Sequence, residues 1–293
     1  YTLLGYLFQL LPIDSIAIRM HLLSAIVGTI AGAAVYGVVS QLTNSQLNNK
    51  EREHSYLIFF APYFAFLTVT LATNHWQHSI HANPHIITAA FLVINVYLLA
   101  KWAKSQNEPQ SSNFYLYLFS LSAGLGTSHH PLTVFSFPAY IVFILWIKPR
   151  IIFDWRTLLK MVGSAAVGLT LFLYYPIRSP QLSEFWPQTM NTWEGFTAHV
   201  LARGLSDSLP YYSLAEQPIR AVVFWSILRL QFAIPVILLA VFGAVYLLRD
   251  KKLRPYAGLI LTAFITNYAF VISLKAQDIM AYIQGPILLI GIM

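Results

Sequence analysis

The chain has 293 residues, of which 57% are hydrophobic and only 10% are charged, and its mean hydropathy is +0.60. Ordinary soluble domains carry about 25% charged residues, so this composition excludes a soluble globule of this length. The sequence contains no cysteine, which excludes disulfides, thiolate metal sites and thiol nucleophiles within it.

Residues 1–20 place five leucines at helical spacing before Pro12 and Asp14 break the run. A single apolar face of this kind is typical of a helix that lies in the membrane interface. We therefore expect an interfacial helix on the outer side, joined to a first membrane span. That span carries Gly28, Gly32 and Gly37 on one face, which leaves room for another helix to pack closely.

A stretch of about 20 apolar residues crosses the hydrocarbon layer of a membrane. The chain contains nine candidate spans, several of them shorter than this: 22–43, 56–73, 84–101, 114–128, 131–147, 157–175, 231–248, 256–274 and 279–293. The sequence therefore predicts an all-α fold, a polytopic transmembrane helix bundle of about nine spans, forming one domain over residues 1–293.

The connectors between these spans alternate in charge. Every second connector is basic, and these connectors hold twelve of the eighteen Lys and Arg residues with five of the eleven acids, which accounts for the whole net charge of +7. The connectors between them hold seven of the nine histidines. Because cytoplasmic loops are enriched in Lys and Arg, we place the basic connectors in the cytoplasm and attribute the high pI to topology rather than to a nucleic-acid partner.

The segment 176–230 is the extramembrane stretch with most room for structure. Its apolar tail from Pro218 to Leu230 predicts an interfacial helix, so we expect a long outer loop that carries amphipathic helices. Aromatic residues at the headgroup level commonly anchor a protein. For Trp186 and Trp193, anchoring and sugar stacking both remain open.

Polar residues collect at the outer ends of the spans. They are Asn74, His75, His78, His81, Asn83, His85, His129, His130, Arg178, Lys275, Asp278 and Tyr282. Such groups are costly at the edge of the hydrocarbon unless they face water or one another. We therefore expect several connectors to converge on one aqueous cleft.

Three interpretations compete for the histidines. His78, His81 and His85 have helical spacing that suits a metal, but no carboxylate completes the set and Pro84 interrupts the helix. Haem ligands usually lie inside spans rather than at their ends. Phosphate binding, or proton donation to a leaving group, suits a cavity that contains His129, His130 and Arg178. An ordinary interfacial residue remains the alternative for each of them, and we favour it for His21, His54 and His75.

Asp278 lies between two apolar runs, with Lys275 as the nearest charge in the sequence. A carboxylate in this position either pairs with a cation or acts as a base. Both interpretations stay open.

Several motifs occur in an order that matches a known family. The chain begins Tyr-Thr-Leu-Leu-Gly, continues with Gly-Leu-Gly-Thr-Ser-His-His at 124–130, Tyr-Pro-Ile-Arg-Ser at 175–179 and Trp-Glu-Gly-Phe at 193–196, and ends with Asp278, Tyr282 and Pro286. Nearly the whole chain resembles a polytopic GT-C glycosyltransferase family that includes the animal protein O-mannosyltransferase of plexin-type domains and bacterial relatives once catalogued as a domain of unknown function.

The resemblance implies an inverting transfer of a sugar from a polyprenyl- or dolichyl-phosphate donor to a hydroxyl of a protein, lipid or glycan. It implies an integral, multi-pass protein of the bacterial inner membrane or the endoplasmic reticulum, with its site on the periplasmic or lumenal face. We expect no cofactor, although a divalent metal stays open. On this basis Arg178, His129 and His130 hold the donor phosphate, Asp278 orients the sugar or the acceptor, and the acceptor and sugar cleft is shaped by His81, Asn83, His85, Trp186, Trp193, Glu194, His199, Arg203 and Tyr282.

The chain departs from the family pattern at two places. It has Asn83-Pro84-His85 where relatives usually have Glu-Val-Tyr, so a carboxylate and a phenol are missing there. The family also carries its main catalytic carboxylate in a loop that precedes the segment beginning at Tyr1. Since Tyr1 is not an initiator methionine and Met293 ends inside an apolar run, we interpret the sequence as a fragment of a longer chain.

Two other functions remain as alternatives. A secondary transporter or channel for a polar or anionic solute also gathers polar groups between spans, but usually near the membrane midplane and within inverted repeats. The second alternative is a scaffold that binds a lipid-linked sugar without transferring it. A radiolabelled polyprenyl-phosphate sugar distinguishes an enzyme from both alternatives, because only an enzyme forms a glycosylated product.

Overall fold

The computed structural model describes residues 1–46, 56–106, 112–181, 190–203, 208–276 and 278–293, and within these ranges it consists of helices and connecting turns without a strand. The all-α prediction is confirmed. The helices are α1 (Thr2–Gln9), α2 (Ile16–Gln46), α4 (Leu57–Thr70), α5 (Thr73–Ile80), α6 (His85–Ser105), α7 (Phe114–His129), η1 (Pro131–Ser136), α8 (Phe137–Ile147), η2 (Pro149–Phe153), α9 (Trp155–Leu169), η3 (Thr170–Leu173), α10 (Tyr174–Arg178), η4 (Ser179–Gln181), α11 (Trp193–Val200), η6 (Leu214–Glu216), α12 (Gln217–Gln231), α13 (Ile234–Arg249), α14 (Arg254–Ser273), α15 (Ile279–Tyr282) and α16 (Gln284–Ile292).

Several helices have the length and composition of membrane spans. Four described segments qualify alone: Ile16–Ser45, His85–Ser105, Trp155–Arg178 and Arg254–Ser273. Shorter apolar helices cover Ile58–Thr70, Pro131–Ile147 and Ile279–Ile292. The helix boundaries follow the expected spans to within a few residues, except that α2 begins six residues earlier. A polytopic bundle fits these helices, and the number of about nine spans stays a prediction.

Prolines and capping residues account for where several helices begin and end. The run of leucines forms α1, which ends before Pro12, and α2 begins only at Ile16. Pro84 lies in the break between α5 and α6, because a proline ring is poorly accommodated inside a helix. Asp154 caps α9 by accepting the backbone N–H of Thr157 at 3.1 Å. These breaks bring the connectors to the two ends of the bundle.

The centre of the bundle is α6. Its side chains Val93, Leu99 and Trp102 are fully buried among α2, α7, α8 and α16. The small face of α2 contacts its neighbours as expected: an added Cβ at Gly28 would meet the Ser79 side chain, and one at Gly37 would meet the Tyr97 ring. These small residues let the helix backbones approach closely. Close packing stabilises the contact between two apolar helices, which would otherwise pack equally well against lipid chains.

Helices α7 and α9 cross at even closer range. A Cβ on Gly124 would overlap the backbone carbonyl of Ala165, and a Cβ on Gly168 would overlap the α7 backbone at Leu125. Backbone atoms cannot move aside as a flexible side chain can. The two glycines therefore set the distance between α7 and α9.

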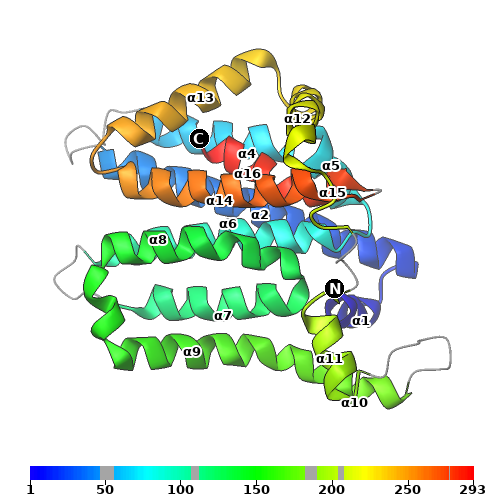
Figure 1. Ribbon diagram of the computed structural model, residues 1–293. Coiled ribbons are helices and arrows are strands. Elements are labelled where there is room, and N and C mark those ends of the chain that lie inside the picture. Colours follow the sequence, from blue (N-terminus) through cyan, green and yellow to red (C-terminus); the bar gives the residue numbers. More distant parts are fainter. Residues whose placement is uncertain (47–55, 107–111, 182–189, 204–207, 277) are drawn as a thin grey trace.

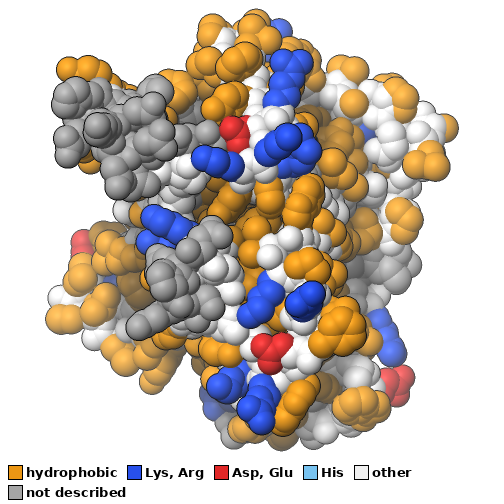
Figure 2. All heavy atoms as spheres, turned by 90° about the vertical axis from the view of Figure 1, so that its left-hand side faces the viewer, with side chains coloured by type: hydrophobic (Ala, Val, Ile, Leu, Met, Phe, Trp, Pro, Cys, Tyr) orange, Lys and Arg blue, Asp and Glu red, His pale blue; other side chains and the backbone are white. Residues whose placement is uncertain are grey.

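The basic connectors lie together at one end of the bundle. In Figure 1 this is the left-hand end, where α6, α8 and α13 finish and α7, α9 and α14 begin. Figure 2 shows Lys and Arg side chains gathered on that face. The described basic residues of these connectors are Lys101, Lys104, Lys148, Arg150, Arg156, Lys160, Arg249, Lys251, Lys252 and Arg254. Helices α1, α5, α11 and α15 lie at the opposite end, which is also the end of the connectors that carry most of the histidines.

The segment from 214 to 249 contains a sharp change of direction. The helical stretch Leu214–Gln231 and α13 are bent by 111° at the short break between them, and Figure 1 shows α12 running across the bundle. This orientation fits the expected interfacial helix over 218–230. Its position in a membrane interface stays a prediction, as does the division of residues 1–293 into one domain with an outer loop.

The α7–α9 crossing makes a stability prediction with a built-in control. We expect Gly168→Ala to destabilise the bundle by about 1–3 kcal/mol, because the added methyl group forces two backbones apart. Gly163 lies on the same helix with no atom near its Cβ position, so Gly163→Ala should be neutral or stabilising by up to about 1 kcal/mol. Thermal unfolding of the detergent-solubilised protein measures both changes. An equal loss in the two variants contradicts the close crossing.

Candidate functional site

A cavity of about 660 Å³ lies at the histidine end of α7. Its lining comes from two parts of the chain far apart in sequence: His129 and His130 at the end of α7, and Tyr175, His199 and Arg203 from α10, α11 and the turn after it. The structure thus brings together four of the residues expected at the site, and adds Tyr175. We refer to this space as the polar cavity.

His130 occupies extended backbone between α7 and η1. Its Nδ1 accepts the backbone N–H of Leu132 at 3.1 Å, so a neutral ring carries its proton on Nε2. Burial, with smaller contributions from His85 and His129, lowers the pKa of His130 to about 3. The ring is therefore neutral at physiological pH and has one N–H group to donate.

His129 connects α7 to the start of α6. Its Nε2 lies 2.9 Å from the backbone carbonyl oxygen of Pro84, to which it donates a hydrogen bond. A neutral imidazole has only one N–H, so this donor is already engaged within the protein. The geometry gives His129 a positioning function, and its contact with a phosphate stays a prediction.

The opposite wall of the polar cavity is built by α10 and α11. The rings of Tyr175 and His199 meet edge to face with centroids 4.4 Å apart, and burial lowers the pKa of His199. Arg203 follows α11 and is exposed. Arg203 is the cation among the described lining residues.

A second group of rings adjoins the polar cavity through His130. His85, the first residue of α6, has its ring 4.9 Å from that of His130 and 4.3 Å from that of Tyr282, measured between centroids. The ring centroid of Tyr282 lies 6.1 Å from that of His130. The expected sites around His85, His130 and Tyr282 are therefore one contiguous cluster that joins α6, α7 and α15.

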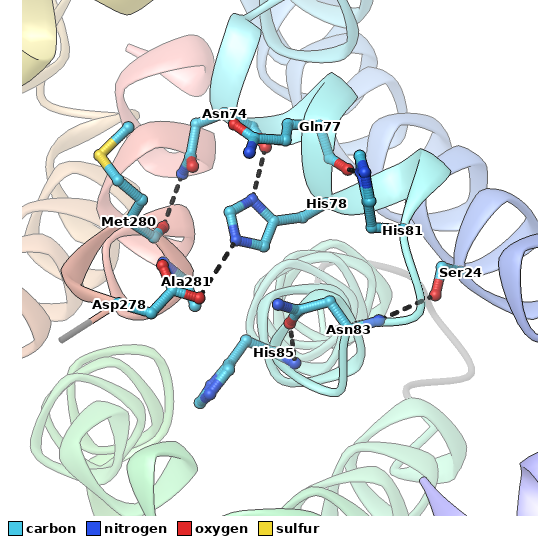
Figure 3. Close-up of polar contacts among 10 residues, drawn as sticks. All are labelled: Ser24, Asn74, Gln77, His78, His81, Asn83, His85, Asp278, Met280 and Ala281. Carbon is cyan, nitrogen blue, oxygen red and sulfur yellow. Dashed lines mark hydrogen bonds and ion pairs between the residues drawn. The ribbon is translucent and has the colours of Figure 1, made fainter. Parts of the chain in front are cut away.

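Asp278 faces His78 across the gap between α15 and α5 (Figure 3). Its Oδ2 lies 4.0 Å from Nε2 of His78, and the Asp278 side chain is 60% exposed whereas that of His78 is 6% exposed. Nδ1 of His78 donates to the Asn74 carbonyl oxygen at 2.8 Å. Pairing of Asp278 with a cation such as Lys275 was one of the two interpretations of this carboxylate. Among the described residues Asp278 pairs with His78, and the Lys275 ammonium donates to the Tyr211 hydroxyl at 3.1 Å.

Asn74 fixes the relative position of α5 and α15. Its side-chain amide donates to the Met280 carbonyl at 2.8 Å, and its backbone N–H donates to the side chain of Gln231 at 2.7 Å. Asn74 is fully buried. It therefore holds the carboxylate-bearing segment against the first turn of α5 and the end of α12.

The remaining expected site residues lie apart from the polar cavity. His81 is exposed and its ring lies 6.2 Å from that of His21, while Asn83 accepts the His85 backbone N–H and so starts α6. Trp193 is 80% exposed on α11, and Glu194 beside it is exposed too. Neither lines the polar cavity.

Arg178 and Trp186 are the other two residues expected at the site. Arg178 is exposed at the end of α10, one turn after Tyr175, and is not among the residues that line the polar cavity. Trp186 lies outside the described residues.

The break at Pro84 decides the geometry of the proposed metal set. Helix α5 ends at Ile80, and His81 already has extended backbone, so His78, His81 and His85 do not share one helix face. Among the described residues, no three His, Asp or Glu side chains form a group that could hold a metal ion.

Sequence reasoning missed three residues that the structure brings to the site. The sequence analysis named His78 as a polar group of the expected cleft and as a possible metal ligand, Asn74 as one of many polar groups, and Tyr175 as part of a motif, and it predicted no partner for any of them. The i, i+4 spacing of Asn74 and His78, which places both on one face of α5, was the available signal for the first two. The contact between Tyr175 and His199 joins distant segments and had no local signal.

Comparison with known proteins supports the sequence resemblance. Residues 1–152 match the family described as the N-terminal domain of the protein O-mannosyl-transferase TMEM260. The chain belongs to this family. The matched part contains α1 to α8 with His129 and His130, and the family supports a glycosyltransferase function with a sugar donor and a protein acceptor. Neither a curated protein nor a solved structure shows significant similarity to the chain.

The neutral state of His130 makes a pH-dependent prediction. Its pKa falls from 6.5 in the unfolded chain to about 3 in the folded protein, so the unfolded state takes up a proton first as the pH falls. The contribution of the neutral His130 ring to stability is fully present well above pH 6.5. It is lost as the pH falls from about 6.5 to about 3. At pH 5 this one group costs about 2 kcal/mol.

We therefore expect His130→Asn, which cannot titrate, to reduce the difference in thermal midpoint between pH 7.5 and pH 5. Replacement of the exposed His21 by Asn controls for the loss of a histidine as such. An unchanged pH dependence in His130→Asn would mean that folding does not lower the pKa of His130.

Proposed function

We propose that the chain forms the membrane part of a glycosyltransferase of the GT-C type, which transfers a sugar such as mannose from a polyprenyl-phosphate donor to a hydroxyl group of a protein. The observation that carries the proposal is the polar cavity at the end of the bundle opposite the basic connectors. If the basic end is cytoplasmic, the polar cavity faces the periplasm or the lumen. A lipid-linked donor is reached there from the bilayer, and its headgroup requires polar groups at the surface.

The polar cavity offers two kinds of group to a phosphate. Arg203 supplies a permanent positive charge and a planar set of N–H donors, which matches the geometry of phosphate oxygens. His130 supplies a neutral N–H from Nε2. We propose that these two residues hold the donor phosphate, together with Arg178 one turn beyond Tyr175, while His129 positions the end of α7.

The transfer itself exchanges one bond for another. The acceptor oxygen forms a bond to the anomeric carbon, the bond from that carbon to the phosphate oxygen breaks, and the phosphate leaves with the electron pair. A carboxylate accepts the proton of the acceptor hydroxyl. Charge increases on the departing phosphate, so cations and N–H donors aimed at it stabilise the transition state more than the bound donor.

Asp278 is proposed to orient the sugar or the acceptor. Its partner His78 is buried and donates a hydrogen bond to the Asn74 carbonyl oxygen. The Asp278 carboxylate is exposed, so it contacts a fixed partner and stays accessible to a substrate. The ring cluster of His85 and Tyr282 connects this carboxylate region to His130. Sugar and phosphate groups of one donor therefore have adjacent partners.

A transfer assay tests the proposal. Membranes containing the full-length protein, a protein acceptor and polyprenyl-phosphate mannose with a radioactive sugar should yield labelled acceptor. We expect Arg203→Ala to lower kcat/KM roughly 10- to 100-fold, since a hydrogen bond to a charged group contributes about 1.5–3 kcal/mol. Arg203→Lys, which keeps the charge, should recover part of the activity.

Arg229 provides the matched control. It is also an exposed arginine, in the last turn of α12, and does not line the polar cavity. Arg229→Ala should leave kcat/KM unchanged within about twofold. Label that accumulates inside sealed vesicles without modifying the acceptor would favour a transporter instead, and equal activity of Arg203→Ala and the wild type would remove Arg203 from the phosphate site.

A further inference from the structure

A small internal space lies where α6, α8, α14 and α16 meet, next to the ring cluster. His85 and Tyr282 of the ring cluster line it, together with Thr88 of α6 and Gln284 of α16. The space leaves about 10 Å³ for the centre of a water molecule, which is enough for one water. We refer to it as the Gln284 site.

Gln284 is the most deeply buried polar group of this site. It is the first residue of α16, and its side chain is 1% exposed. Neither its amide nitrogen nor its amide oxygen has a hydrogen-bond partner among the described residues. A buried amide without a hydrogen bond is strongly destabilising, whereas an apolar side chain of similar size carries no such cost. The amide therefore points to a ligand that can form hydrogen bonds.

Two more atoms at the same site have no partner among the described residues. They are Oγ1 of Thr88, whose side chain is 4% exposed, and Nδ1 of His85. Thr133 also lines the site, but its hydroxyl donates to the His130 carbonyl oxygen at 2.7 Å. The unpartnered atoms thus belong to the first turns of α6 and α16.

The chemistry of these atoms selects the ligand. A glutamine amide and a threonine hydroxyl both donate and accept hydrogen bonds, and a buried water commonly makes two to four of either kind. The described lining residues include no Asp or Glu, so nothing there offsets the cost of removing a cation from water. We propose that one ordered water molecule binds at the Gln284 site and bridges the Gln284 amide to Thr88 and His85.

The water joins the beginnings of two helices. Gln284 starts α16 two residues after Tyr282, and His85 starts α6. The rings of His85 and Tyr282 meet with centroids 4.3 Å apart. A hydrogen bond between the water and Nδ1 fixes the rotation of the His85 ring in this contact. The water thus supports the ring cluster from inside the bundle, and its binding does not depend on the proposed transfer reaction.

A cryo-EM map of the full-length protein in lipid nanodiscs, at a resolution that shows ordered water, tests the site directly. We expect one density peak about 2.7–3.2 Å from the Gln284 amide and from Oγ1 of Thr88. A Gln284 amide that bonds only to protein groups, with no peak beside it, overturns the proposal. Thermal midpoints should be equal in sodium chloride and choline chloride. A higher midpoint in sodium would identify a bound cation instead of water.

A double-mutant cycle tests the bridge in solution. Gln284→Met and Thr88→Val remove the polar atoms with little change in shape. Each should lower the thermal midpoint of the full-length protein by about 2–4 °C. The double variant should lose clearly less than the sum, because the second substitution removes a bridge that the first has already broken.

Thr133→Val is the matched control for the cycle. Its hydroxyl lines the same site but bonds to the protein, so its effect should add to that of Gln284→Met. A rise in midpoint for Gln284→Met would mean that the native amide has no partner. Additive effects of Gln284→Met and Thr88→Val would mean that the two residues share no ligand. Either result overturns the proposal.

Discussion

The positions of the charged and polar residues in the bundle depend on the free-energy cost of placing a charge inside the hydrocarbon layer of the membrane. Apolar helices leave only their ends for Lys, Arg, His and Asp, so charged and polar residues are divided between two faces of the bundle. The described basic residues of the connectors occupy one face, and His78, His130, Arg203 and Asp278 occupy the other end. The position of the polar cavity follows from this division, because polar side chains gather where the helices end.

The shape of the site comes from how α7 is held. Two glycines bring α9 against α7, and Pro131 with the extended backbone of His130 turns the chain into η1 and α8. The two neighbours of α7 are therefore held by different contacts. At its end, His129 bonds to the Pro84 carbonyl and the His130 ring contacts His85, so α7 and α6 are fixed to each other where the polar cavity begins.

The fold was largely predictable because hydropathy and proline reveal helices one at a time. The boundaries of α6, α7 and α14 follow from apolar runs, and the break before His85 follows from Pro84. The site was less predictable because it is made of contacts between distant segments. Its division into the polar cavity and the pair of His78 with Asp278, and the exposure of Trp193, depend on tertiary packing that no local pattern contains.

The central claim is that the basic face and the polar cavity lie on opposite sides of the membrane. Because the sequence lacks cysteine, single cysteines can report sidedness in a full-length background without any other. Trp193→Cys on α11 and Lys251→Cys between α13 and α14 both replace exposed residues. A membrane-impermeant maleimide added to sealed vesicles of known orientation should label Trp193→Cys from the periplasmic or lumenal side and Lys251→Cys only from the cytoplasmic side. Labelling of both from the same side would contradict the account.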